Sequence, residues 1–332
     1  MGVWMFFKKD NNSNEDFIND IEKLSEEINS CKRQIKELKE KQQSYEEILD
    51  SHYNLFNTLF IDYDLKAKGI MKNLQELCQE VLDFAANICN KHDLSWFIMD
   101  GTLLGAKRHS TYIPWDDDVD MGMLRGDFDK FNQIADDEIK NNGIEDYLTL
   151  NVYPLTRENF IMPFTKLDCM LDDDHVLGGI DVFPFDFAKD NRIDHDEFMD
   201  MRNELFVGLV TCEDKKSLIS DFHKKFNLDY DKGKYIIKDP TAVRYKYRSR
   251  EIAFWDVDKF LPLGQIKFNG RHYSCPRDVD HYLKLEYGDY MKIPKVLKDQ
   301  HHNIDTLRDI ENIDEKYETF IAKLQEANAN FK

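Results

Sequence analysis

The sequence predicts an α+β fold of mixed α/β character, in which a long N-terminal coiled-coil helix precedes a globular body built on a small mixed sheet. An apolar 4-3 repeat runs through residues 14–63, where Gly and Pro are absent. Between residues 119 and 187, strand patterns alternate with helical patterns. The remainder, to residue 332, alternates charged helices with loops. These observations favour two domains, residues 1–64 and residues 65–332.

The 4-3 repeat places a line of mostly apolar side chains along one face of the predicted helix. Two polar members, Gln42 and His52, are interpreted as interruptions that set the register rather than as ligands. The stripe needs a partner, which is a second copy of the helix, the following helix in a hairpin, or the globular body. We expect a homo-oligomer through this coil. The repeat comprises Phe17, Ile21, Leu24, Ile28, Cys31, Ile35, Leu38, Gln42, Tyr45, Leu49, His52, Phe56, Leu59 and Tyr63.

The composition predicts a folded protein that does not bind nucleic acid. Its 332 residues are 42% hydrophobic and 13% aromatic, which supplies a sizeable core and excludes general disorder. Lys and Arg number 45 against 64 Asp and Glu, a formal net charge of −19. This balance argues against the basic surface that nucleic-acid binding needs. An anionic substrate is still compatible with it, because a local basic cluster or a bound cation can outweigh the distant field.

Cysteine spacing and hydropathy predict an intracellular protein. The six cysteines are scattered without a C-x-x-C pair, which indicates neither a zinc ribbon nor a disulfide framework and fits a reducing compartment. The apolar stretch near the first residue is too short for a secretory signal. No segment approaches the roughly 20 apolar residues of a spanning helix. We therefore expect no transmembrane segment and a location in the cytoplasm or at the inner membrane surface.

The elements of the globular body follow from local periodicity. Residues 66–92 have helical spacing, and Lys91 and His92 suit a C-terminal turn, so this helix should end near Asn90. A turn and a helix start are expected at residues 100–105. A second helix is expected over Asp127–Ile139. The predicted strands are Ser95–Met99, Val119–Met123, Leu148–Tyr153, Phe160–Asp168 and Ile180–Phe185.

A glycine-containing turn directly follows the first predicted strand. Gly101 and Gly105 flank Thr102 where the strand gives way to a helix. Glycines at such a junction let backbone amides approach an anion, and a helix N-terminus favours negative charge. The pattern therefore predicts a phosphate contact by these three residues. The alternative is that a Gly-Thr turn simply caps the helix.

An acidic run lies just before the next predicted strand. Asp116, Asp117, Asp118 and Asp120 repel one another unless a cation neutralises them or they point apart. Such runs are often solvated turns, but apolar residues flank this one on both sides. If the chain from residue 118 is extended, Asp118 and Asp120 lie on the same face. Two carboxylates at that spacing can bind Mg²⁺ or Mn²⁺.

A third acid stands alone in a later strand. Asp181 has apolar neighbours, and burying it without a cation or hydrogen bonds would be costly. Beside Asp118 and Asp120 it would complete a three-carboxylate metal cluster. Trp115 either stacks on the substrate or belongs to the core. Nearby basic residues could hold a nucleotide pyrophosphate or could form ordinary surface ion pairs; they are Lys107, Arg108, Arg125 and Lys166.

The stretch Asp100–Leu103 also invites comparison with the D-x-D-G-T loop of haloacid-dehalogenase-type phosphatases. In that loop the first Asp is the nucleophile and follows a strand. The corresponding position here is Ile98, which cannot form a phospho-aspartate. Hydrolysis of phosphate esters is therefore a disfavoured alternative.

Three segments together resemble the LicD family, whose members are phosphotransferases related to fukutin and fukutin-related protein. Asp100–His109 and Tyr112–Met123 resemble the family's central signature, and Ile180–Asp186 is similar to its downstream D-[IV]-F-P-x-D element. The family's closing segment is matched by Tyr282-Leu283, Tyr287–Pro294 and His301-His302. The resemblance runs from about residue 70 to residue 303, so the coiled coil lies outside it.

The resemblance implies a nucleotidyltransferase-like core and a transfer reaction. Family members move a phosphorylated alcohol, such as phosphocholine or a polyol phosphate, from a CDP-linked donor to a sugar hydroxyl. The acceptor would be a cell-surface glycan such as lipopolysaccharide, teichoic acid or capsule, either free or lipid-linked. Aromatic residues could cage a choline group, whereas a polyol would need hydrogen-bonding side chains. A catalytically inactive scaffold or glycan-binding relative is the alternative.

The resemblance also implies a role for each candidate residue. Asp118, Asp120 and Asp181 would hold two ions of Mg²⁺ or Mn²⁺. Gly101, Thr102 and Gly105 would bind donor phosphate, and Lys107 or Arg108 would stabilise the transition state. Either Asp116 or Asp181 would accept the proton of the attacking hydroxyl. The remaining candidates for substrate binding are Trp115, Arg125 and Lys166.

Overall fold

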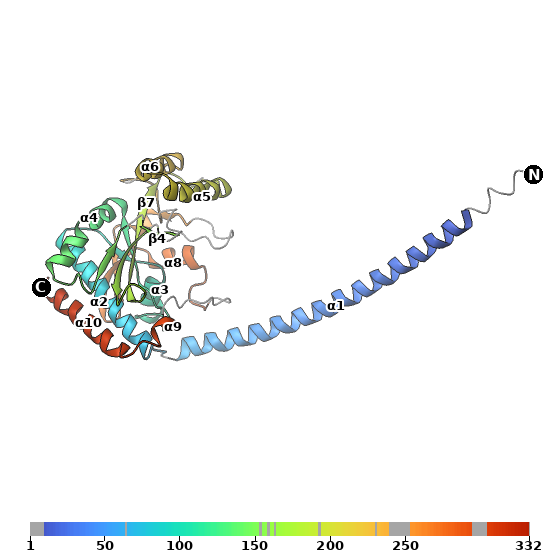
Figure 1. Cartoon of the computed structure of the whole chain (residues 1–332), viewed down its shortest axis with the longest axis horizontal. Helices are drawn as coiled ribbons and strands as arrows, with labels where there is room; N and C mark the ends of the chain where they lie inside the picture. Colours follow the sequence, from blue (N-terminus) through green and yellow to red (C-terminus); the bar gives the residue numbers. More distant parts are fainter. Residues whose placement is uncertain are drawn as a thin grey trace, which may run out of the picture. The chain divides into compact units, whose positions relative to one another are not determined.

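The computed structural model describes residues 10–63, 65–152, 155–157, 160–162, 164–191, 194–229, 231–238, 253–293 and 304–331. The chain divides into two compact units, Met1–Asp64 and Leu65–Lys332. Most of the first unit is one helix, and the second is a mixed α/β body (Figure 1). The predicted α+β class is therefore confirmed. Within the described ranges, no helix is both long enough and apolar enough to cross a bilayer.

The N-terminal unit contains the helix α1 (Asp10–Asp62), which runs without interruption for 53 residues. Its sequence carries no helix breaker, and its polar faces carry pairs one turn apart, such as the Gln43 amide donating to Glu47 Oε1 at 3.2 Å. Large apolar side chains of the 4-3 repeat remain exposed, from 37% at Leu59 to 64% at Leu38. The predicted long helix is confirmed, and its pairing as a coiled coil stays a prediction.

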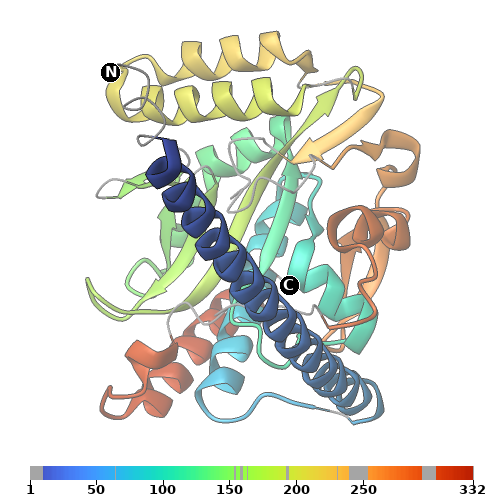
Figure 2. The same ribbon diagram turned by 90° about the vertical axis from the view of Figure 1, so that its right-hand side faces the viewer.

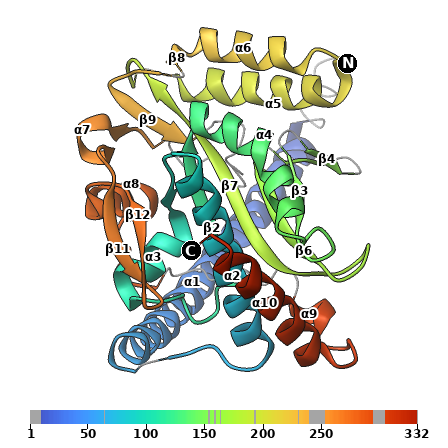
Figure 3. The same cartoon turned by 90° about the vertical axis from the view of Figure 1, so that its left-hand side faces the viewer.

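The body begins with the amphipathic helix α2 (Ile70–Lys91), which ends where the sequence predicted. One side of α2 lies against the sheet, and α10 (Ile313–Ala329) packs beside it (Figure 3). The side-chain amide of Asn328 joins the two helices by donating to the backbone oxygen of Glu80 at 3.0 Å. The C-terminal helix therefore closes the core that α2 begins.

The main sheet is mixed and has eight strands. Its path runs β1-β2-β7-β6-β3, and β7 also pairs at its far end with β8 and with β9, which carries β10. Among the described pairings of this sheet, β2 and β7 are parallel and the others are antiparallel. The strands are β1 (Phe97–Ile98), β2 (Asp120–Leu124), β3 (Thr149–Asn151), β6 (Thr165–Met170), β7 (Val176–Ala188), β8 (Leu228–Asp229), β9 (Tyr235–Lys238) and β10 (Trp255–Asp256).

Each predicted strand overlaps a strand of the structure but differs from it in bounds, and two of these differences affect the sheet or the acidic segment. The predicted strand Phe160–Asp168 is two strands, because β5 (Phe160–Met162) pairs only with β4 (Leu155–Arg157) while β6 joins the main sheet. The acidic stretch before Asp120 is not part of a strand, so Asp118 precedes β2 instead of lying within it. Tyr153, Pro294, His301 and His302, which the sequence analysis also singled out, lie outside the described residues.

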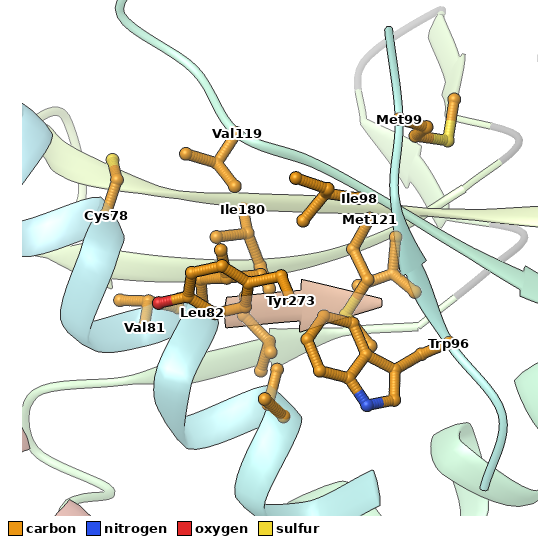
Figure 4. Close-up of a cluster of buried hydrophobic side chains, with 14 of the residues drawn as sticks. Cys78, Val81, Leu82, Trp96, Ile98, Met99, Val119, Met121, Ile180 and Tyr273 are labelled. Carbon is orange, nitrogen blue, oxygen red and sulfur yellow. The ribbon is translucent and has the colours of Figure 1, made fainter. Parts of the chain in front are cut away.

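The two faces of the central strands have opposite character. Met121 of β2 and Ile180 of β7 are buried, and Figure 4 shows them among side chains of α2 that include Leu82. Successive side chains of a strand point to opposite faces. Asp120 and Asp181 therefore lie on the face turned away from α2. The core on one face fixes the register that brings the acids together on the other.

Further helices surround the sheet. Two of them, α5 (His195–Thr211) and α6 (Lys215–Lys225), lie side by side (Figure 2) and bury a smaller apolar cluster that includes Phe198 and Phe222. Both begin with an aspartate cap, since Asp194 and Asp214 accept backbone N–H bonds. The other helices are α3 (Asp100–His109), α4 (Arg125–Asn141), α7 (Val257–Phe260), α8 (Val279–Tyr287) and α9 (Ile304–Leu307).

A hairpin in the C-terminal part corrects the expectation of helices and loops there. The strands β11 (Gly264–Phe268) and β12 (Arg271–Cys275) pair antiparallel around Asn269 and Gly270. These two residues have φ angles of +46° and +84°, and positive φ at both central positions is typical of a type I′ turn. The Asn-Gly dipeptide is a hairpin signal that the sequence prediction overlooked.

Candidate active site

A row of charged side chains crosses the centre of the sheet. Asp120 of β2 pairs in register with Asp181 of β7, and Asp181 pairs in turn with Lys166 of β6. Neighbouring strands lie about 4.8 Å apart, so the side chains of this row are close neighbours on one face. Lys166 Nζ lies 2.7 Å from Asp181 Oδ1. The two acids predicted from separate segments are thus adjacent, and a lysine neutralises one of them.

The acids are close enough to perturb one another. Burial raises the pKa of Asp120 well above its usual range, and the charges of Asp118, Asp100 and Asp181 raise it further. Lys238 acts in the opposite direction and lowers the same pKa. Burial is the larger cause of the shift, and the neighbouring negative charges that add to it favour a cation at this place.

Asp116 lies in a loop that is fastened to the body. Its backbone N–H donates to Ile113 at 3.0 Å, and the Gln75 amide donates to the backbone oxygens of Ile113 and Asp116 at 3.2 and 2.9 Å. Burial, then Asp118 and Asp117, raises the pKa of Asp116 well above its usual range, while Arg108 lowers it. Asp116 is therefore held in place and is unusually basic for a carboxylate.

Gly101 has a geometric reason to be glycine. A Cβ atom at this position would lie 2.8 Å from Asp116 Oδ2, closer than real Cβ atoms come to an oxygen. The residue lies in the first turn of α3, where the backbone amides have no partners within the helix. The missing side chain therefore lets a carboxylate, or an anion in its place, approach the helix N-terminus.

Thr102 and Gly105 have other roles than the predicted phosphate contacts. Thr102 is buried, and its hydroxyl accepts the backbone N–H of Asp120 at 2.9 Å, which ties α3 to β2. Gly105 lies further along α3, where a Cβ would come within 2.7 Å of the Thr111 backbone oxygen. Both residues thus help to position the acidic segment, and their contact with a phosphate stays a prediction.

The two predicted transition-state cations differ in position. Arg108 donates to the backbone oxygen of Tyr290 at 2.7 Å, and burial lowers its pKa to about 10, with the charge of Asp116 acting against this. Lys107 lies 3.1 Å from Asp280 Oδ2 on α8. The structure thus places Arg108 near the acidic loop and pairs Lys107 with a different acid.

Arg125 is part of the core. The residue is 4% exposed, and its guanidinium donates to both carboxylate oxygens of the fully buried Asp186, at 2.9 and 2.7 Å. This pair joins the first residue of α4 to β7. The prediction that Arg125 contacts the substrate is therefore wrong, because its guanidinium already has a buried bidentate partner. Trp115 is half-buried and packs against the main core, which supports the core alternative for this residue.

Three residues absent from the predicted set complete the site. Asp100 has a φ of +42°, which is uncommon for a residue other than glycine, and it begins α3. Tyr282 of α8 donates its hydroxyl to Asp100 Oδ1 at 2.7 Å, and Lys238 of β9 forms an ion pair with Asp100 Oδ2. Trp255 stacks on Tyr282 with ring centroids 4.7 Å apart. Asp100 thus combines an uncommon backbone conformation with a carboxylate held by two partners, which is typical of a functional site.

Lys238 is a buried cation beside the acids. Burial opposes its charged form, but Asp100 and then Glu286 raise its pKa above the usual value. Its ammonium also lies 5.3 Å from the centroid of the Phe183 ring. The sequence signal for this residue is weak, because Lys238 stands 138 positions from Asp100 and ends a short apolar strand that the prediction did not recognise.

The donor chemistry of the site suits a hard divalent cation. Asp118, Asp120 and Asp181 offer carboxylate oxygens, the ligands that Mg²⁺ and Mn²⁺ prefer, and their mutual repulsion raises the pKa of Asp120. In the described part of the chain, no three His, Cys, Asp or Glu side chains already form a metal-binding group. A metal at this site therefore remains a proposal that rests on the adjacency and charge of the acids.

The arrangement defines a nucleotidyltransferase-like domain: a Gly-Thr turn follows one strand, acids open the next, and a third acid lies on its parallel neighbour. Residues 93–211 match the family model described as "LicD/FKTN/FKRP, nucleotidyltransferase domain". This match confirms the predicted resemblance to the LicD family over that segment.

Two relatives show how far the similarity extends. The chain is 23% identical over 267 residues to the lipopolysaccharide cholinephosphotransferase LicD of Haemophilus influenzae, a match covering 71% of this chain and 97% of that protein. It is 30% identical over 117 residues to an uncharacterized protein of Rickettsia typhi, covering 32% of this chain and 33% of that protein. The first match spans nearly the whole relative.

Proposed function

We propose that this protein is a metal-dependent phosphotransferase that moves a phosphorylated alcohol from a CDP-activated donor to a sugar hydroxyl of a cell-surface glycan. The observation that carries the proposal is the adjacency of Asp120 and Asp181 on parallel strands, with Asp118 close enough to raise the pKa of Asp120. The cholinephosphotransferase among the relatives supports the reaction class. A glycan, free or lipid-linked, and the CDP-linked donor would be the partners.

Asp118, Asp120 and Asp181 would hold Mg²⁺ or Mn²⁺, in a pair of ions. Divalent ions at such a site neutralise charge on a pyrophosphate and on the departing nucleotide. Lys166 already lies on Asp181 at 2.7 Å and would remain available to a phosphate oxygen when that carboxylate binds metal. The protein's own cations thus supplement the charge that the donor requires.

Of the two candidate bases, Asp116 fits proton transfer better. Lys166 stabilises the ionised form of Asp181, which makes that carboxylate a weaker proton acceptor. Asp116 has a raised pKa and a backbone fixed by Gln75. We assign it the proton of the attacking sugar hydroxyl, which would pass to the Asp116 carboxylate as the new O–P bond forms and the P–O bond to the departing CMP breaks.

Asp100 and Lys238 would shape the site without reacting. Their ion pair, with the Tyr282 hydroxyl, fixes Asp100 at the start of α3 beside Asp120. Lys238 limits the negative charge that Asp120 experiences and keeps the cluster from repelling an anionic donor. This is positioning combined with charge neutralisation, on which in-line phosphoryl transfer mainly depends.

The donor head group is best tested directly. The rings of Phe164 and Phe183 lie 4.5 Å apart, and each has a lysine ammonium within 6 Å of its centroid, Lys166 at 5.7 Å and Lys238 at 5.3 Å. Aromatic rings that bind ammonium groups could also bind the ammonium of choline. In this structure, however, a lysine ammonium already lies over each ring. CDP-choline, CDP-glycerol and CDP-ribitol should therefore be compared, each with Mg²⁺ and a glycan acceptor, by release of CMP.

The proposal predicts metal-dependent CMP release by the wild-type protein from at least one of these donors. Asp120→Asn and Asp181→Asn should each lower the rate at least about 100-fold, because each removes a carboxylate at the reacting phosphate. Asp173→Asn, at an exposed acid outside the cluster, is the matched control and should retain the rate. Full activity in both cluster variants would overturn the assignment. Failure of the wild type to bind any cytidine nucleotide would favour the scaffold alternative.

A further inference from the structure

The exposed stripe of α1 requires a partner. Isolated helices are marginal in water, and most helical stability in proteins comes from packing an apolar face. Along α1 the side chains of Ile21, Leu24, Ile28, Ile35 and Leu38 are 50–64% exposed. Soluble monomers rarely leave so long a contiguous apolar strip uncovered. The chemistry of the proposed active site lies in the other unit and does not explain the stripe.

The residue types along the stripe specify the number and direction of the helices. With heptad positions lettered so that Ile21 is a and Leu24 is d, Ile28 and Ile35 also occupy a, and Leu38 occupies d. β-Branched residues at a combined with Leu at d favour two parallel strands. The second helix with a matching pattern is α1 of another copy of this chain.

The polar members of the stripe favour the same arrangement. In a parallel, in-register pair, Gln42 at a and His52 at d each face their own copy, so each can form a hydrogen bond across the interface. In an antiparallel pair with full overlap, Gln42 would lie against the partner's Leu38, and His52 against the partner's Ile28. Neither polar side chain would then meet a polar group across the interface, which is costly compared with the parallel pair.

The flanking charges also distinguish the two directions. Residues at g of one helix face e of the other in a parallel pair, which sets Glu27 against the partner's Lys32 and Lys41 against the partner's Glu46. In the fully overlapped antiparallel pair, Lys39 would meet the partner's Lys39 and Lys41 the partner's Lys41, and these repulsions offset the attraction of Lys32 for the partner's Glu46. The parallel pair places only opposite charges together among these residues and is therefore favoured.

We propose that α1 pairs with α1 of a second copy of this chain as a parallel, in-register, two-stranded coiled coil. The residues that follow the coil then leave it at the same end in both copies. The proposal is independent of the proposed reaction, because the acids of the site and the coil belong to different units.

Cysteine cross-linking tests the direction and the register. Cys31 occupies d, and among the described cysteines only Cys31 and Cys212 are exposed, so the full chain carrying Cys212→Ser has one accessible thiol. Two further single-thiol chains combine Cys212→Ser and Cys31→Ser with Leu24→Cys or Leu38→Cys. Mild oxidation with copper phenanthroline should convert all three to covalent dimers, because each thiol faces its own copy. No antiparallel register brings more than one of these positions opposite itself.

Light scattering after size exclusion tests the number of copies. The wild-type chain should be a dimer at micromolar concentration, and Ile28→Glu with Ile35→Glu should be a monomer that retains wild-type CMP release. Asn29→Glu with Gln43→Glu adds the same charge at b positions and should remain a dimer. A monomeric wild type, a trimer or larger assembly, or cross-linking at no more than one position would overturn the proposal. Loss of dimer with CMP release intact separates this result from failure of the proposed function.

Discussion

Arg125 shows how a residue next to the acidic motif can serve the fold instead of the substrate. Arg125→Met would leave Asp186 buried without its bidentate partner. Breaking a buried pair in this way costs about 3–5 kcal/mol, so urea unfolding should detect a large loss of stability. The variant's turnover per folded molecule should stay near wild type. A stable variant with greatly reduced turnover would instead return Arg125 to substrate binding.

Lys238 is expected to matter for both charge and position. Lys238→Met removes the cation that holds Asp100 and moderates Asp120, and we expect CMP release to fall at least about tenfold. Lys238→Arg should recover part of the loss, because it restores the charge. Lys259→Met, at an exposed lysine, is the control and should change little. Unchanged turnover in Lys238→Met would show that the Asp100 ion pair has no part in the reaction.

The ion pairs of Glu138, a residue away from the candidate site, should make the stability of the fold depend on pH. Burial raises its pKa, but Lys91 at 2.8 Å and His92 at 2.7 Å lower it more, and the net direction is downward. A lowered pKa stabilises the fold above the unfolded value, 4.5, and the contribution is lost as pH falls through the folded pKa. At pH 7 the free energy of unfolding of the wild type should exceed that of Glu138→Gln by about 1–3 kcal/mol. Chemical denaturation should show the difference shrinking below pH 4.5, and a constant difference would contradict this cause.

At the scale of elements, hydrophobic periodicity predicted the helices and strands whose formation depends on local sequence. The helices α1, α2 and α4 follow from apolar spacing, α1 and α2 also lack Gly and Pro, and β7 follows from its apolar run. The split between β5 and β6 could not be predicted, because it depends on which strand each segment finds as a partner. The β11–β12 hairpin was predictable from Asn269-Gly270, a dipeptide suited to positive φ.

Two glycines make a matched test of backbone conformation. Gly270 has a φ of +84° and Gly126 lies in α4, and no atom would lie within 4 Å of a Cβ added to either. Gly270→Ala should lower the free energy of unfolding by about 1–2 kcal/mol, because only the left-handed backbone is disturbed. Gly126→Ala should raise it by about 0.5–1 kcal/mol, since alanine favours the helix. Thermal or urea unfolding measures both, and equal effects would contradict the turn assignment.

At the scale of the whole molecule, the candidate site combines predictable and unpredictable parts. The acids at positions 116, 118, 120 and 181 were singled out because carboxylates beside apolar strands need a reason to be there. The partners that hold the cluster, Lys238 and Tyr282, lie far along the chain and reach it only through the β7–β9 pairing and the packing of α8. Spacing in the sequence does not encode such long-range contacts.

Binding of Mn²⁺ tests the central claim most directly, because the ion's electron paramagnetic resonance signal weakens when it is bound. The wild-type chain should bind Mn²⁺, and Mg²⁺ should compete for the same site. Asp120→Asn combined with Asp181→Asn should abolish binding while circular dichroism shows an intact fold, and Asp173→Asn should bind as the wild type does. Equal Mn²⁺ binding by the wild type and the double variant would contradict the claim that these acids form the metal site.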